Sequence, residues 1–287
     1  MKRQRVRTLL ICWALLSLGC GGSDRVVVAS KNFSENVLLA ELIAQQLEQR
    51  GLEVDRRLNL GSTFLCHQGL ASGDIHVYPE YTGTALTAVL KQSVTRSPDE
   101  ALQLVRKAYL EKFQAKWRDP FGFNNTFAVM VRDTEPAELK TISDLAQVAD
   151  RYTIGYNFEF EQRAAGYDGL KKAYGLEFAE EPKTMDLNLV YQALDQGQVD
   201  VAVGNSTHGL IDRLGLRVLK DDREYFPPYD AAAIVRTEAF EKFPGLTEAL
   251  SELSGAIDEN AMRELNRKVD VDQLPVDDVA RQFLSGR

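Results

Sequence analysis

Two segments of this chain, 124 residues apart, align with each other without a gap. Residues 68–77 match residues 192–201, and each segment holds the end of a predicted helix, a glycine at 73 or 197, and the start of a strand. Glycine suits the left-handed turn that ends a helix. Helix–glycine–strand units recur in α/β proteins, so chance and a true repeat both remain open. A true repeat predicts two similar lobes whose equivalent strand ends can hold a ligand between them.

Short β-rich runs alternate with helical stretches from residue 25 onward. A buried strand is expected at 26–29, then a helix capped by Asn32 or Ser34 that ends at Gly51, an extended run at 52–60, a helix capped by Ser62, and a strand at 75–78. This alternation is typical of an open α/β sheet. Two further β-rich segments, 127–131 and 231–235, are predicted to cross between the lobes. Lobe 1 then comprises residues 26–127 plus 231–287, and lobe 2 (residues 128–230) is inserted into it.

The first 25 residues are set apart from the rest. Lys2, Arg3, Arg5 and Arg7 precede an apolar run at 8–18, followed by Gly19 and Cys20. The run is shorter than the roughly 20 residues that span a bilayer, and the pattern predicts a signal peptide over 1–19. Residues 16–20 resemble a bacterial lipobox, although Ser17 stands where leucine is usual. Residues 20–25 are therefore expected to be a tether lipidated at Cys20; plain secretion with an incidental cysteine is the alternative.

Composition and charge exclude several classes of function. The leader carries four bases and no acid, so 30 of the 34 bases remain against 42 acids, a formal charge of −12 that argues against a nucleic-acid partner. The three histidines have no metal-ligand spacing, and there is no phosphate loop or nucleophile elbow. Cys66 is expected to be a small core residue, and His208 to form a surface pair with Asp212. No metal, no cofactor and no catalytic residue are predicted, and the chain is not expected to be an enzyme.

Aromatic residues at strand ends and in turn segments are the most distinctive candidates for ligand binding in this sequence. Tyr78, Tyr81, Phe127 and Tyr229 all lie at the end of a predicted strand or at the start of a crossing. Several ring faces turned toward one point attract a quaternary ammonium ion, although any one of these residues alone is better explained as part of the core or rim. Lys31 and Arg163 are candidates for an opposite pole that binds a ligand carboxylate.

Five short motifs carry a family resemblance. They are Ala-Ser-Lys-Asn-Phe at 29–33, Leu-Gly-Ser-Thr at 60–63, Tyr-Pro-Glu-Tyr-Thr-Gly-Thr at 78–84, Gly-Phe-Asn-Asn-Thr-Phe-Ala at 122–128 and Phe-Pro-Pro-Tyr-Asp at 226–230. Together they resemble the substrate-binding proteins of glycine betaine/choline/carnitine ABC importers, which take up osmoprotectants. The resemblance implies an α/β, two-lobed periplasmic-binding-protein fold of type II, with two hinge crossings and a ligand cleft between the lobes.

The resemblance also implies a ligand site. The aromatic box of the family falls on Tyr81, Phe127, Asn205 and Tyr229, and its carboxylate-binding groups fall on Lys31, Thr84 and Arg163. Phe127 and Asn205 stand where the family has tyrosines, and His208 replaces the acid that usually follows the threonine of the second turn. Losing one ring face is worth about 0.5 to 2 kcal/mol, so a quaternary ammonium ligand is expected to bind roughly threefold to thirtyfold more weakly.

The expected function is that of a monomeric, extracytoplasmic, lipid-anchored receptor. It binds a glycine betaine or choline type of compatible solute and passes it to a permease and an ATPase on other chains. Asn205 and His208 add hydrogen-bonding capacity to one wall. A receptor of the same fold for a less methylated polar amine or an amino-acid-like solute therefore remains an alternative, as does a sensory receptor without transport.

Overall fold

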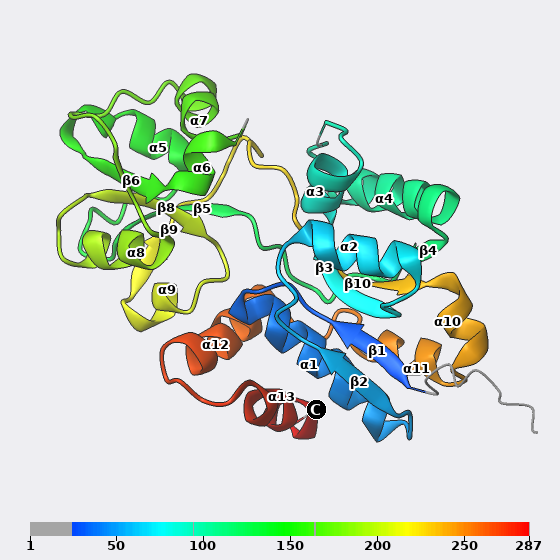
Figure 1. Ribbon diagram of the computed structural model, residues 1–287. Coiled ribbons are helices and arrows are strands. Elements are labelled where there is room, and N and C mark those ends of the chain that lie inside the picture. The colour runs from blue at the N-terminus through cyan, green and yellow to red at the C-terminus, as the bar shows by residue number, and fades with distance from the viewer. Residues whose placement is uncertain (1–24, 94, 164, 287) are drawn as a thin grey trace, which may run out of the picture.

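The chain folds into two lobes, each built on its own five-stranded sheet (Figure 1). The computed structural model describes residues 25–93, 95–163 and 165–286. The first sheet has the order β2-β1-β3-β10-β4, and its strands are β1 (Val26–Ala29), β2 (Val54–Arg57), β3 (Val77–Tyr81), β4 (Ala115–Trp117) and β10 (Ala231–Arg236). The second has the order β7-β6-β8-β5-β9, and its strands are β5 (Phe127–Arg132), β6 (Ile154–Asn157), β7 (Lys183–Met185), β8 (Val201–Asn205) and β9 (Leu216–Val218).

The two lobes share one topology. In each sheet a central parallel strand pairs with a strand that runs antiparallel to it, β3 with β10 and β8 with β5. Strands β3 and β8 are offset by 124 residues, and the helices α2 (Thr63–Ser72) and α8 (Leu187–Asp195) begin with the same offset. The aligned segments 68–77 and 192–201 therefore occupy equivalent helix–glycine–strand units of the two lobes.

The core of lobe 1 lies on both faces of its sheet. Val26 and Val28 of β1 face one cluster and Val27 and Ala29 face the other, as expected for an apolar strand buried on both sides. One face is covered by α1 (Ser34–Gln49), α10 (Thr237–Lys242), α11 (Leu246–Ser251), α12 (Glu259–Asp270) and α13 (Val276–Ser285). The other is covered by α2, α3 (Thr82–Thr84), the π-helical turn η1 (Ala85–Val89) and α4 (Pro98–Phe113).

Lobe 2 is layered in the same way. Phe127, Val129 and Val131 of β5 face one cluster, while Ala128 and Met130 face the other. Its helices are α5 (Ile142–Ala146), the 3-10 turn η2 (Ala149–Arg151), α6 (Phe158–Gln162), α7 (Tyr167–Tyr174), α8 and α9 (Leu210–Arg213). The sequence therefore predicted the fold class and the two lobes correctly.

The two crossings lie slightly earlier in the chain than predicted. Segments 127–131 and 231–235 are strands of the sheets, because their apolar side chains are buried there. The polar and proline-containing residues just before them cross instead. Asn124 and Asp230 form an antiparallel bridge, the Asn125 N–H donates to the Tyr229 carbonyl (3.2 Å), and the Tyr229 N–H donates to Asn124 Oδ1 (2.7 Å). The crossing segments thus run side by side.

Residues 1–24, including the predicted signal peptide and Cys20, lie outside the described residues. Within the described part of the chain, no helix combines the length and apolar character needed to cross a bilayer. The extended run predicted over 52–60 is shorter in the structure, where Val54–Arg57 form β2, and the strand predicted at 75–78 is β3, Val77–Tyr81.

Candidate ligand-binding site

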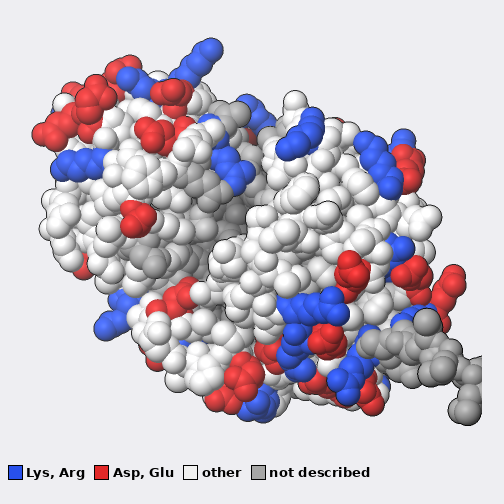
Figure 2. Space-filling view, viewed as in Figure 1, with Lys and Arg blue, Asp and Glu red and all other residues white. Residues whose placement is uncertain are grey.

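A cavity of about 1090 Å³ lies between the two lobes. Figure 2 shows the surface hollowed there, with charged side chains gathered mainly on the outer parts of this face. All seven residues predicted for the ligand site line this cavity: Lys31, Tyr81, Thr84, Phe127, Arg163, Asn205 and Tyr229. Residues far apart in the sequence, such as Lys31 and Arg163, therefore line the same cavity.

Equivalent strand ends from the two lobes form facing walls. Tyr81 is the last residue of β3 and Asn205 the last of β8, and they differ by 124 positions. Thr84 and His208 follow at the same offset, and both line the cavity. Ligands of α/β proteins bind outside the carboxyl ends of parallel strands, which is where these residues lie.

Aromatic rings from four separate segments border the cavity. Phe127 and Tyr229 meet edge to face, with ring centroids 6.4 Å apart and planes at 79°. Phe33 stacks on Tyr81 at 6.1 Å and remains 40% exposed. Sequence reasoning did not assign Phe33 to the site; the signal available was its position just after the carboxyl end of β1, in the same turn as Lys31.

Gly83 supports the ring of Tyr229. A Cβ at position 83 would lie 2.7 Å from the Pro228 carbonyl oxygen and 2.8 Å from the Tyr229 ring, so only glycine fits without displacing this wall. We expect Gly83→Ala to weaken ligand binding about tenfold, because the ring must move. Gly69→Ala is the matched control, since its Cβ would press on the Ile75 side chain outside the cavity. Calorimetric affinities of the two variants check this; equal affinities would contradict it.

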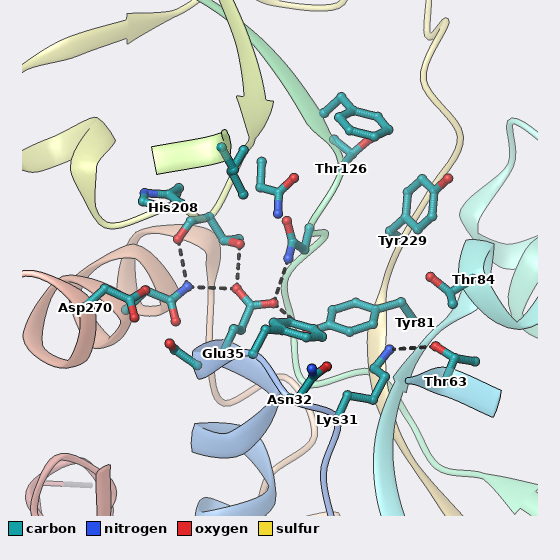
Figure 3. A pocket seen from close by; sticks show the side chains of 18 of the residues that line it. Lys31, Asn32, Glu35, Thr63, Tyr81, Thr84, Thr126, His208, Tyr229 and Asp270 are labelled. Carbon is teal, nitrogen blue, oxygen red and sulfur yellow. Dashed lines mark hydrogen bonds between the residues drawn. The ribbon is translucent and has the colours of Figure 1, made fainter. Parts of the chain in front are cut away.

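Lys31 lies beside Tyr81, at the same end of the cavity. Its ammonium forms a buried ion pair with Glu80, lies 3.4 Å from Thr63 Oγ1, and is 4.6 Å from the centre of the Tyr81 ring (Figure 3). This differs from the expected pole of Lys31 and Arg163 opposite the rings. The reason is Glu80, whose fully buried carboxylate needs a cation close by.

Glu35 is the functional candidate that sequence reasoning missed. It lies in the first turn of α1, lines the cavity and is 5% exposed. Its carboxylate accepts four hydrogen bonds: from Tyr81 Oη (2.7 Å) and Asn125 Nδ2 (2.8 Å) at one oxygen, and from Thr207 Oγ1 (2.5 Å) and Asn266 Nδ2 (2.8 Å) at the other. Burial raises the pKa of Glu35, while these hydrogen bonds act in the opposite direction.

His208 is turned inward, so its predicted surface pair with Asp212 is wrong. The imidazole stacks on Tyr191 with centroids 4.2 Å apart and planes at 24°, and its Nδ1 accepts the Leu210 N–H at 3.2 Å. Asp212 is exposed and lies 3.9 Å from Arg263. Burial lowers the pKa of His208 to about 4, so the ring is neutral near pH 7. A flat neutral ring thus adjoins the position where Asn205 replaces an aromatic residue.

Cys66 is buried, as predicted for a small core residue, and forms no disulfide within the described residues. Burial raises the pKa of its thiol to about 11, which leaves it protonated and a poor nucleophile near neutral pH. Over the described residues, no group of three or more His, Cys, Asp and Glu side chains has the arrangement of a metal site.

Known proteins with similar sequences point to one family. The family model described as the substrate binding domain of ABC-type glycine betaine transport systems matches residues 24–286. The carnitine transport binding protein OpuCC of Listeria monocytogenes is 36% identical over 276 residues, covering 94% of this chain and 89% of that protein. The glycine-betaine-binding protein of Pseudomonas aeruginosa is 32% identical over 293 residues, covering 97% and 93%.

Similar solved structures share the two-lobed architecture. A structure described as a glycine betaine/carnitine/choline ABC transporter superposes with a TM-score of 0.87 at 32% identity, covering 91% of this chain and 98% of that one. The match of the family model extends over both lobes and over every segment that lines the cavity. This chain therefore belongs to the family of substrate-binding domains of ABC-type glycine betaine transport systems.

Proposed function

We propose that this protein is the extracytoplasmic receptor of an ABC importer and that its cavity binds a zwitterionic quaternary ammonium solute, such as glycine betaine or carnitine. The observation that carries the proposal is the convergence of Tyr81, Phe127 and Tyr229 on a cavity that Lys31 and Arg163 also line. A quaternary ammonium ion has no N–H to donate, so ring faces and nearby negative charge are the groups that hold it.

The cavity contains charge of both signs. Arg163 of lobe 2 and Lys31 of lobe 1 line it, as do the carboxylates of Glu35, Asp186 and Asp270. A ligand with one positive and one negative group suits such a lining better than a simple cation does. Arg163 offers a planar pair of donors for a carboxylate, and Thr84 adds a hydroxyl.

Delivery to a permease and an ATPase on other chains completes the proposed role. Lipid anchoring at Cys20 and a monomeric state in solution belong to the same proposal. Two lobes joined by crossings that run side by side can close over a ligand by bending there, which excludes water from the site. Relatives named for carnitine and glycine betaine binding support this assignment.

Calorimetric titration of the purified protein tests the ligand class. Glycine betaine, carnitine, choline and an uncharged osmolyte such as sucrose are compared under one buffer condition. We expect saturable heats at one ligand per chain for the quaternary ammonium compounds and none for sucrose. Trp117 fluorescence is a poor reporter here, because the indole is buried in β4 and does not line the cavity. Absence of saturable heat with every quaternary ammonium compound would overturn the proposal.

Arg163→Ala is expected to separate ligands by their carboxylates. Loss of a charge-assisted hydrogen-bond partner costs about 1.5 to 3 kcal/mol, so affinity for glycine betaine should fall about tenfold or more while that for choline changes little. Arg151→Ala, an exposed arginine in lobe 2 that does not line the cavity, is the control. Equal losses for the two ligands in Arg163→Ala would show that Arg163 is not the carboxylate partner.

A further inference from the structure

Glu35 lies where lobe 1, the first crossing segment and lobe 2 meet. Its own helix α1 and Asn266 of α12 belong to lobe 1, Asn125 lies in the first crossing segment, and Thr207 follows β8 of lobe 2. Figure 3 shows this carboxylate at the base of the cavity, next to the Tyr81 ring. A buried carboxylate is costly unless every oxygen is satisfied, and here both oxygens accept two hydrogen bonds.

The turn after β8 is held by the same group of residues. Asn266 Nδ2 donates both to Glu35 and to the Thr207 carbonyl (2.8 Å each), and Arg263 Nε donates to the Ser206 carbonyl (2.8 Å). At Gly209, a Cβ would lie 2.5 Å from the backbone of Arg267, so α12 and the turn are in direct backbone contact. Lobe 2 therefore contacts lobe 1 through α12 and Glu35 as well as through the two crossings.

Glu35 also determines how the Tyr81 hydroxyl is used. The Tyr81 hydroxyl could act as donor or acceptor, but the Glu35 carboxylate can only accept. The hydroxyl therefore donates to the carboxylate at 2.7 Å, as Asn125 Nδ2 does at 2.8 Å. A phenol that donates to an anion carries more negative charge on its oxygen and ring, because hydrogen bonds polarise the groups they join. A more negative ring attracts a cation more strongly.

We propose that Glu35 is a positioning residue, which orients and polarises Tyr81 for a cationic ligand and fixes the 206–208 turn of lobe 2 against it. The part concerning the ligand rests on the proposed function, whereas the part concerning the turn does not. Ligand affinity and the contact between the 206–208 turn of lobe 2 and lobe 1 then both depend on one buried carboxylate.

Glu35→Gln tests the role in binding with little change of shape. The amide nitrogen of the glutamine can face Asn125 and Tyr81 if the Asn125 amide turns over, because Asn125 Oδ1, which has no hydrogen-bond partner among the described residues, can then accept from it. The Tyr81 hydroxyl then becomes an acceptor, and the charge beside the ring is gone. We expect affinities for glycine betaine and for choline both to fall about tenfold, since the effect acts on the shared ammonium group.

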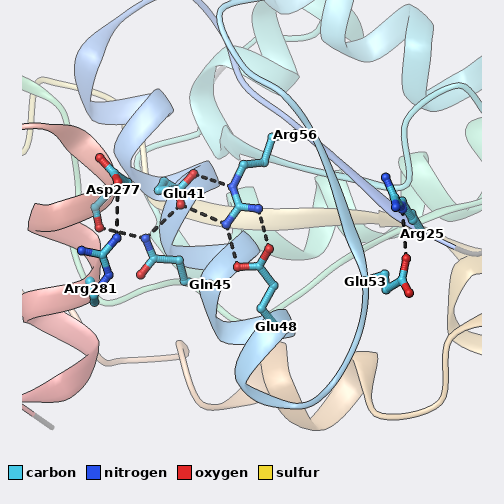
Figure 4. Close-up of polar contacts among 8 residues, drawn as sticks. All are labelled: Arg25, Glu41, Gln45, Glu48, Glu53, Arg56, Asp277 and Arg281. Carbon is cyan, nitrogen blue, oxygen red and sulfur yellow. Dashed lines mark hydrogen bonds and ion pairs between the residues drawn. The ribbon is translucent and has the colours of Figure 1, made fainter.

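Glu41→Gln is the matched control on the same helix. Glu41 is also a buried glutamate of α1, but its carboxylate binds Arg56 and Gln45 (Figure 4), and none of these three residues lines the cavity. Its replacement is expected to lower the melting temperature and to leave ligand affinity unchanged. Equal affinity of wild type and Glu35→Gln for both ligands would overturn the proposal.

A double-mutant cycle with Tyr81→Phe separates positioning from general loosening. Tyr81→Phe keeps the ring and removes the hydroxyl, so it should weaken glycine betaine several-fold in the wild type and hardly at all in Glu35→Gln. Effects that simply multiply would show that Glu35 does not act through the Tyr81 hydroxyl, and would contradict the proposal.

Hydrogen exchange of the ligand-free protein tests whether Glu35 fixes the 206–208 turn of lobe 2. The Ser206 and His208 amides donate to the Thr126 and Asn205 carbonyls, so their exchange reports on the turn. In Glu35→Ala we expect these amides to exchange about tenfold or more faster than in wild type, with no change in Glu41→Ala. Unchanged exchange in Glu35→Ala would contradict the role of Glu35 in fixing the turn, whatever the ligand proves to be.

Discussion

Tyr81→Ala is expected to weaken glycine betaine about thirtyfold or more. The substitution removes a ring face, worth about 2 kcal/mol when the contact is desolvated, and it removes one of the four donors to the buried Glu35 carboxylate. Phe33, which stacks on Tyr81, loses its neighbour as well. Calorimetric titration with glycine betaine and choline measures the loss, which should be similar for the two because they share the ammonium group.

Tyr167→Ala is the control for this prediction. Tyr167 packs with Tyr156 in the core of lobe 2 and does not line the cavity. Its removal should lower stability without changing affinity. A Tyr81→Ala protein that retains wild-type affinity would show that the ring does not contact the cation.

His208 should make the protein less stable as the pH falls below 6.5. Its pKa is lowered on folding from 6.5 to about 4, so the folded state must exclude a proton that the unfolded state binds. Stability is unaffected above pH 6.5 and is lost progressively between pH 6.5 and about 4. The full shift corresponds to about 3 kcal/mol.

Comparison with His208→Phe isolates this contribution. Phenylalanine keeps a flat ring against Tyr191 and cannot titrate. Other groups change in both proteins alike: burial lowers the pKa of His67 and His76 and raises that of Glu35. Urea unfolding at pH 7.0 and 4.5 should therefore show a stability difference between wild type and variant that grows in favour of the variant at the lower pH. A pH-independent difference would exclude His208 as the source.

Much of this fold could be predicted from local sequence pattern. The apolar run 26–29 is a strand buried on both faces, and the spacing of 124 residues identifies the two equivalent units. Tyr81 and Asn205 could be placed at the cavity because strand ends with the same topology point to the same crevice. These features depend on the periodicity of neighbouring residues, which a sequence displays directly.

Side-chain partnerships across the fold could not be predicted. Lys31 pairs with Glu80, and Glu35 binds Thr207 and Asn266, through contacts between residues 49 to 231 positions apart. Such pairs depend on how helices and strands pack and on the requirement that each buried charge be satisfied. For the same reason the sequence pattern predicts a surface position for His208, whereas its ring stacks on the fully buried Tyr191.

A crystal structure of the protein with glycine betaine tests the central claim most directly. We expect the ligand between the lobes, with its trimethylammonium group within about 6 Å of the ring centres of Tyr81, Phe127 and Tyr229. Its carboxylate should face the Arg163 side chain. A ligand bound outside this cavity, or one whose ammonium group points away from the three rings, would contradict the account.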